Sequence, residues 1–382
     1  MKIADCIIQI RTAIELSSKR WPLGKLPWAY RALRQWRIDN EQEHLLNRGK
    51  QKIKALLLTI LILMLPCVPS VMAKPTAEPP LVLMLLWRGM TEAEIGFQDY
   101  FAANGLPVRY EIWNTNKDRQ LLRAMIEQIP ELGPDLIYTF GTTVSVAVLG
   151  TVRQSTSVGN YAPQIFNIVA DPAGAGLVQE MPETDISGLT GVSHNVPVDA
   201  QLEAMKELDD FHSIAALFNP LEENSRLALA ALSASAEKAG IAVEKVAINE
   251  ADFAGEVPAI GKILTRIKQS GIELVYLPSD SLLISNARQV VSHSHNAGLL
   301  TFSATEAPIR KGGALVGIVA PYRNVGQLAG FKARQIIFGN KKANEIAVET
   351  LSRFSLIVNM KAAHQLNYYP PVTMMQFAEV IQ

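Results

Sequence analysis

The stretch LVLMLLW (81–87) is an uninterrupted apolar run, and TEAEIGFQDYFAANG (91–105) follows it. The apolar residues of the second segment fall on one face of a helix, which a glycine, Gly105, ends. A strand without a polar face needs cover on both sides, as in a parallel sheet packed between helices. This strand and helix therefore predict an α/β fold.

The same alternation repeats along the chain in two series. The first series ends with QIFNIVADP (164–172), which leads into a predicted helix, GAGLVQEM (174–181). The second begins after SGLTGVSHNV (187–196). The other predicted strands are VRYEIW (108–113), PDLIYTFG (134–141), SIAALFNP (213–220), IAVEKVAI (241–248), IELVYLPSD (272–280), LLTFSA (299–304) and GALVGIVAPY (313–322).

Two series of this kind predict two doubly wound parallel-sheet lobes joined by a multi-strand hinge. We expect lobe I to comprise 81–195 plus 323–347, and lobe II to comprise 196–322 plus 348–382. A strand pair near ETLSRFSLIVN (349–359) is expected close to the end of the chain. The chain then crosses between the lobes more than once, which is typical of a hinged clamp.

Composition excludes several classes of protein. The 382 residues include 36 Lys and Arg against 36 Asp and Glu, and 48% are hydrophobic, so the chain is neither disordered nor a polycation for nucleic acid. The only cysteines are Cys6 and Cys67. No disulfide framework and no multi-cysteine zinc site is expected from two cysteines.

Residues 48–73 resemble a secretory signal peptide. A basic segment, RGKQKIK, precedes the apolar ALLLTILILML (55–65), and small residues stand before an expected cleavage after Ala73. The alternative is an inner-membrane anchor over residues 55–73, which carry no charge. In both cases the remainder of the chain is expected in the periplasm.

Residues 1–47 form an N-terminal extension that is unusually long for a signal peptide. One hypothesis is that translation begins near 46–48, and the other is that the extension is a short cytoplasmic amphipathic segment. Cleavage after Ala73 leaves 24 basic and 31 acidic residues, a charge of about −7. Such an acidic chain is unsuited to binding nucleic acid or anionic lipid by charge.

An ordered set of segments resembles the substrate-binding proteins of a bacterial ABC-transporter family with the type I periplasmic-binding fold. Better understood members of that family take up aromatic amino acids. The likeness spans about residues 81–372. It is carried by PDLIYTFGTTVSVAV (134–148), VADPAGAGLV (169–178), SGLTGVSHNV (187–196), FNPLEENS (218–225), YLPSDSLLIS (276–285), GGALVGIVAPYRNVGQLAGFKARQIIFGN (312–340) and IVNMKAAHQLNYYPP (357–371).

Ligands of open α/β sheets bind beyond the carboxyl ends of the strands, so the residues that follow the predicted strands are candidates. Thr142 and Thr143 open a helix whose free N–H groups suit a carboxylate, although simple helix capping is an equal alternative. Asp280 and Glu306 are candidates to balance a ligand ammonium. The full predicted set is Trp87, Gly141, Thr142, Thr143, Asp171, Asn219, Asn224, Asp280, Ser281, Glu306 and Tyr322.

Two positions depart from the pattern of the family. Where the family often has Asp-Tyr, this chain has Pro321 before Tyr322, and Ser281 follows Asp280 where an Asn is common. An acidic and an amide contact are thus missing relative to the family, which argues against an aromatic amino acid as the ligand but not against a ligand in the cleft.

The resemblance implies capture of a small organic solute, such as an amino acid or similar carboxylate, by hinge closure and its delivery to an inner-membrane ABC permease. The alternative is a ligand-sensing module that docks on a membrane-bound receptor. No catalytic motif is visible, so no enzyme activity, cofactor or metal site is expected. We expect a monomer that binds no nucleic acid.

Overall fold

The computed structural model describes residues 78–154, 162–179, 181–182 and 188–382. The N-terminal extension and the predicted signal segment, 1–47 and 48–73, lie outside these residues. In the part of the chain that is described, no helix has the length and apolar character needed to cross a membrane.

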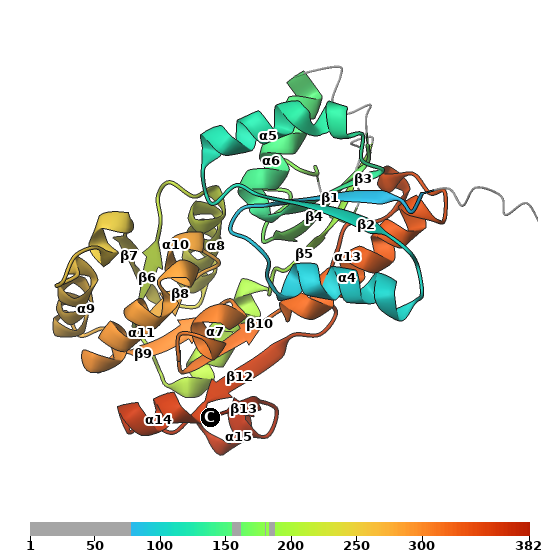
Figure 1. The fold of residues 1–382 in the computed structure, drawn as a ribbon. Coiled ribbons are helices and arrows are strands. Elements are labelled where there is room, and N and C mark those ends of the chain that lie inside the picture. Colours follow the sequence, from blue (N-terminus) through green and yellow to red (C-terminus); the bar gives the residue numbers. More distant parts are fainter. Residues whose placement is uncertain (1–77, 155–161, 180, 183–187) are drawn as a thin grey trace, which may run out of the picture. The chain divides into compact units, whose positions relative to one another are not determined.

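The first sheet has six strands in the order β11-β5-β4-β3-β1-β2, and every pair of neighbours is parallel. Helices α5 and α6 pack on one face of this sheet, and α4 and α13 pack on the other (Figure 1). The elements of this lobe are β1 (Leu81–Leu86), α4 (Glu92–Ala103), β2 (Arg109–Asn114), α5 (Arg119–Leu132), β3 (Leu136–Phe140), α6 (Gly141–Gln154), β4 (Gln164–Val169), β5 (Leu189–Ser193), α13 (Tyr322–Ile337), a 3-10 turn (Ala343–Glu345) and β11 (Glu349–Thr350).

The second sheet has seven strands in the order β13-β12-β10-β9-β8-β6-β7. All its pairs are parallel except β10 with β12, which is antiparallel. The elements of this lobe are α7 (Val198–Leu208), β6 (Ser213–Phe218), α8 (Glu223–Lys238), β7 (Ala242–Ala247), a 3-10 turn (Glu250–Phe253), α9 (Ala259–Gln269), β8 (Leu274–Leu277), α10 (Ser281–Ser285), α11 (Ala287–Asn296), β9 (Leu300–Ser303), α12 (Glu306–Arg310), β10 (Val316–Val319), β12 (Ser355–Asn359), α14 (Met360–Leu366), α15 (Val372–Met375) and β13 (Glu379–Ile381).

The α/β fold with two parallel-dominated sheets is confirmed, and three local predictions are wrong. Turns occupy 172–176 in place of the expected helix, because Gly176 adopts a left-handed φ of +71°. A strand, β5, lies within SGLTGVSHNV (187–196), a segment for which no strand was predicted. The predicted strand pair at 349–359 is two strands of different sheets, since β11 pairs with β5 and β12 pairs with β10.

The chain passes between the two sheets three times: after β5, after β10 and after β11. The lobe boundaries drawn from the sequence stay a prediction. The strand pairing differs from them at one place. Residues 349–350 were expected in lobe II but pair with the first sheet. The last crossing therefore lies between β11 and β12.

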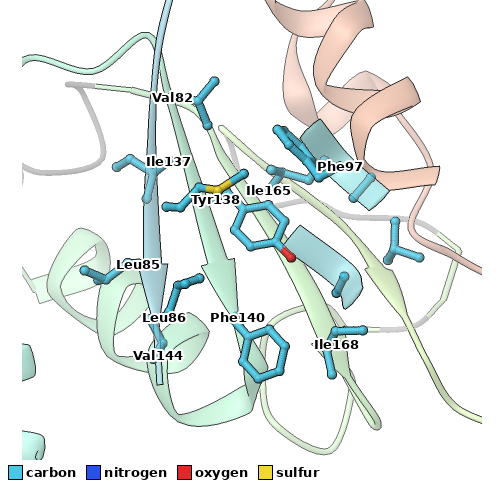
Figure 2. Packing of buried hydrophobic residues seen from close by; sticks show 14 of the residues in the cluster. Val82, Leu85, Leu86, Phe97, Ile137, Tyr138, Phe140, Val144, Ile165 and Ile168 are labelled. Atoms are coloured by element: carbon cyan, nitrogen blue, oxygen red, sulfur yellow. The ribbon is translucent and has the colours of Figure 1, made fainter. Parts of the chain in front are cut away.

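A buried cluster of apolar side chains joins the first sheet to α4 and α13. Phe97 of α4 packs its ring on Tyr138 of β3, as Figure 2 shows. The two ring centroids are 5.0 Å apart. The Tyr138 hydroxyl donates to the Glu94 carboxylate at 2.6 Å, and Glu94 also accepts from the Thr91 N–H in a capping box at the start of α4. Burial raises the pKa of Glu94. This polar network fixes α4 under the sheet.

Two glycines bring α4 and α13 into backbone contact. A Cβ atom on Gly326 would lie 1.9 Å from the Ala93 carbonyl oxygen, and one on Gly96 would lie 2.1 Å from the Arg323 carbonyl oxygen. Only a residue without a side chain fits at either position. A helix from late in the sequence thus completes the cover of the first sheet, and Figure 1 shows α13 beside α4.

Candidate functional site

A cavity lies between the carboxyl ends of the strands of the two lobes. Its enclosed volume is about 20 Å³, and the empty space of about 350 Å³ around it includes space open to solvent. Segments that follow β1, β3, β5 and β8 line it, together with β4 and the first residues of α8 and α13. The lining residues are Trp87, Arg88, Phe140, Gly141, Thr142, Thr143, Ile168, His194, Asn224, Ser279, Ser281 and Tyr322.

Hydrogen bonds across the cavity connect the two lobes directly. Arg88 donates to Ser281 Oγ at 3.3 Å, and His194 Nε2 lies 3.0 Å from Ser279 Oγ. The lobes are therefore in contact around the cavity, the arrangement expected of a closed clamp. Two more cross-lobe bonds join Lys117 Nζ to Ser285 Oγ at 2.6 Å and Arg119 Nη2 to the Leu221 carbonyl at 3.3 Å.

Seven of the predicted ligand-binding residues line the cavity. On the lobe I side, Gly141 has a φ of +79° that lets the chain turn from β3 directly into α6. Thr142 and Thr143 follow in the first turn of that helix, where N–H groups have no partner within the helix. The seven are Trp87, Gly141, Thr142, Thr143, Asn224, Ser281 and Tyr322. Their role as ligand contacts stays a prediction.

Two of the other predicted residues support the loops behind the cavity. Asp280 is fully buried, and its carboxylate accepts from the Asn219 N–H and the Leu283 N–H, both at 2.9 Å. The Asn219 side chain accepts from the Leu221 N–H at 3.0 Å. Neither Asp280 nor Asn219 lines the cavity. In this arrangement Asp280 caps α10 and ties two strand-end loops together.

The remaining two predicted residues also bond to backbone and lie outside the lining. Asp171 accepts from the Gly174 N–H at 2.8 Å within its own turn. Glu306 accepts from the Tyr322 N–H at 2.9 Å and pairs with Arg310 at 3.0 Å. Glu306 thus holds the start of α13, where the chain returns to lobe I.

Five lining residues were not predicted from the sequence. Arg88 and Ser279 stand immediately beyond a predicted strand or at its end, so the rule of strand ends applies to both. His194 follows β5, a strand that was not predicted. Phe140 and Ile168 lie in strands that read as pure core. The five are Arg88, Phe140, Ile168, His194 and Ser279.

Ile168 has an unusual backbone conformation for a β-branched residue, with φ of +56°. The register between β4 and β5 shifts at this point, which identifies a bulge. The bulge lets Ile168, which is adjacent to the buried Asn167, line the cavity near Phe140 (Figure 2). Such a strained residue costs about 1–3 kcal/mol, and strain of this kind concentrates at functional sites.

The cavity carries a guanidinium without an ion-pair partner. Arg88 is half-buried, its Cζ lies 5.0 Å from the Phe140 ring centroid, and no carboxylate in the described residues forms an ion pair with it. The N-terminus of α6 adds positive potential from the helix dipole. The lining is thus electropositive.

Three lining side chains have buried polar atoms without a hydrogen-bond partner. They are Trp87 Nε1, His194 Nδ1 and the Tyr322 hydroxyl. Burial raises the pKa of Tyr322, while the charge of Arg88 lowers it. Buried polar groups are rarely left unpaired, so these atoms indicate a place for a bound molecule or ordered water.

His194 is uncharged at neutral pH. Its side chain is buried, and burial followed by the positive charge of Arg88 lowers its pKa from 6.5 to about 4. An uncharged imidazole hydrogen-bonds to Ser279 across the cavity.

His194 should therefore make stability depend on pH. The unfolded chain takes up its proton near pH 6.5 and the folded chain only near pH 4, so stability is present above pH 6.5 and is lost as pH falls toward 4. We expect a loss of up to about 3 kcal/mol relative to His194→Gln. Urea unfolding at a series of pH values measures this, and parallel curves for the two proteins would contradict it.

In the described residues, no group of three or more His, Cys, Asp or Glu side chains is placed to hold a metal ion. The site is one of neutral polar groups, aromatic rings and a single cation. Such a lining suits non-covalent binding of a small polar solute.

The ABC transporter substrate binding protein family model matches residues 84–378 of the chain. The chain therefore belongs to this family, whose members are solute-binding proteins and not enzymes. They bind small ligands for ABC transporters and are typically extracytoplasmic. The lobes and cavity described above have the form of a type I periplasmic binding protein. No curated protein sequence matches the chain.

Three solved structures share the fold. An ABC domain in complex with L-Trp from Streptococcus pneumoniae is 24% identical, with a TM-score of 0.69 over 79% of this chain and 100% of that chain. A conserved domain protein from Vibrio cholerae is 20% identical, with a TM-score of 0.70 over 79% and 99%. A substrate-binding protein with adhesive properties from Clostridium difficile, in a ligand-free open structure, is 21% identical with a TM-score of 0.60 over 79% and 99%.

Proposed function

We propose that this protein captures a small organic solute, an amino acid or similar carboxylate, in the cavity between its lobes and delivers it to an inner-membrane ABC permease. The observation that supports this most directly is the cavity itself, which residues of both lobes line and direct hydrogen bonds cross. A solute that contacts both sides stabilises the closed state and thereby reports its presence to a partner. The chain acts as a monomer in this proposal.

The predicted signal peptide at 48–73 supports action in the periplasm, with an inner-membrane anchor at 55–73 as the alternative. In both arrangements the lobes face the compartment from which an importer takes up its solute. N-terminal sequencing of the protein isolated from the periplasm distinguishes a cleaved from an anchored chain.

A substitution that fills the cavity should weaken capture. Thr143 is half-buried in the first turn of α6 and lines the cavity, so Thr143→Tyr places a ring in the space for the solute. After a thermal-shift screen of amino acids, other small acids and polyols, we expect this variant to bind the best solute at least about tenfold more weakly. Calorimetry of binding measures the affinity.

The matched control is Thr265→Tyr, at an exposed position of α9. It should bind the solute with unchanged affinity. Equal affinities of the Thr143→Tyr protein and the unmodified protein would show that the solute binds elsewhere, and a screen without any binding solute would contradict capture itself.

The alternative function is sensing, in which the closed form docks on a membrane-bound receptor. Uptake of the identified solute by cells with and without the gene separates the two functions. Lost uptake supports delivery to a permease, whereas normal uptake with a lost response to the solute supports sensing.

A further inference from the structure

We propose that the solute is a small organic acid that lacks an ammonium group, such as an oxo acid or a simple carboxylic acid, and not an α-amino acid. This inference rests on the proposed function, because it names the class of molecule that the cavity captures. The charged groups around the cavity carry it.

The first step is that the cavity attracts an anion. Arg88 is a half-buried guanidinium without an ion pair, and its hydrogen bond to Ser281 is long at 3.3 Å. A guanidinium offers five N–H donors in a planar fork that matches a carboxylate. Thr142 and Thr143 present the N-terminus of α6, a helix of 14 residues, to the same space. A carboxylate at this position meets both sources of positive potential.

The second step is that no acid lines the cavity to balance an ammonium. Asp280 is fully buried and accepts two backbone N–H bonds, and Glu306 is held by a backbone N–H and by Arg310. Glu222 lies behind the lining, where it accepts from the Ser281 N–H at 2.8 Å. Burial raises the pKa of Glu222 and the negative charge of Asp280 raises it further, while the Ser281 hydrogen bonds and the charge of Arg88 lower it.

An α-amino acid and an oxo acid differ in the charge that they bring into the cavity. An amino acid would bring an ammonium into a space whose only charged lining residue is the cation Arg88, and a buried charge without a direct partner is strongly unfavourable. An uncharged oxo or hydroxyl oxygen has no such cost. It also supplies an acceptor for Trp87 Nε1, which is a donor only and has no partner.

Matched solutes on one carbon skeleton test this directly. We would titrate the unmodified protein with alanine, pyruvate and propanoate, then with leucine, ketoisocaproate and isocaproate, then with phenylalanine, phenylpyruvate and hydrocinnamate. In the series that fits best, the oxo acid or the simple acid should bind at least about tenfold more tightly than the amino acid. Hydrocinnamamide and the amides of the other acids, which lack the negative charge, should bind at least about tenfold more weakly than their parent acids.

Arg88→Gln removes the cation and should weaken binding of the best acid at least about tenfold, with little effect on its amide. The control is Arg288→Gln, at an exposed position of α11, which should leave both affinities unchanged. The comparison of acid with amide on the unmodified protein does not depend on how the variant folds.

An amino acid that binds as tightly as its deaminated partner, or an amide that binds as tightly as its acid, overturns the inference and leaves capture of a solute intact. The same conclusion follows if the protein binds only a different solute, such as a polyol, and Thr143→Tyr blocks that binding. Absence of any binding solute contradicts the proposed function as well.

Discussion

The Gly326→Val protein is expected to be less stable than the unmodified protein by about 3 kcal/mol or more. A Cβ at this position would lie 1.9 Å from the Ala93 carbonyl oxygen, which belongs to helix backbone and is not a side chain that can rotate away. The helices α4 and α13 must therefore separate. Overpacking of this kind costs at least about 1–3 kcal/mol, and the looser packing along the rest of the helix pair adds to that cost. Chemical unfolding followed by circular dichroism measures the change.

The control for this experiment is Gln327→Val, one position further along α13, where the side chain is exposed. It introduces the same β-branched residue into the same helix and should cost less than about 1 kcal/mol, from helix propensity alone. Similar losses in the two proteins would show that the close approach of the helices contributes little.

The second large effect is expected for Asp280→Ala. The substitution leaves the buried N–H group of Leu283 without an acceptor, and an unsatisfied buried donor costs about 1–3 kcal/mol. The Asn219 N–H loses one of its two acceptors and keeps Ser225 Oγ at 3.0 Å. We expect a loss of about 2 kcal/mol in the free energy of unfolding, with a smaller loss for Asp280→Asn, which keeps one acceptor oxygen. Urea unfolding measures both.

Asp199→Ala, at an exposed position of α7, is the control and should change stability by less than about 0.5 kcal/mol. The same experiment also distinguishes the two roles of Asp280. A variant with normal stability but no affinity for the solute would show that Asp280 contacts the ligand, and that its place as a cap is secondary.

The fold was predictable because hydrophobic periodicity reports burial directly. The run at 81–87 has no polar face, and it forms a strand buried within a parallel sheet. The strand β5, LTGVS, was missed because small and polar residues do not form an apolar run. Its Gly191 is needed because a Cβ there would lie 2.4 Å from the Phe166 ring of the neighbouring strand. The need for glycine arises only when β5 pairs with β4, so it is not visible in the sequence of β5 alone.

The sequence predicted which residues of the candidate site follow a strand, but not which way their side chains point. The rule that ligands bind beyond strand ends located Thr142, Thr143 and Ser281 in the cavity. It did not show which polar residue there faces the cavity and which one turns back to bind the loop. Asp280 and Ser281 are adjacent, yet the first holds backbone N–H groups and the second lines the cavity.

Nothing in the sequence singled out Arg88 or Ile168 as residues that would line the cavity. A single arginine after a strand looks like any surface charge, and its lack of an acidic partner is visible only in three dimensions. The left-handed bulge at Ile168 arises from the register of two strands, because nothing in the residue type favours that conformation. A pattern of apolar and polar residues predicts neither the unpaired arginine nor the bulge.

The triple passage of the chain between the sheets has a consequence for the order in which the lobes are completed during synthesis. Lobe I begins with β1 at Leu81, but its helix α13 and its edge strand β11 end only at Thr350. A nascent chain that has emerged only as far as Ser193 has α4 on one sheet face but leaves uncovered the part of that face on which α13 will pack. Lobe I must therefore wait for most of lobe II to be translated, and no fragment cut between the lobes contains a whole lobe in one continuous piece.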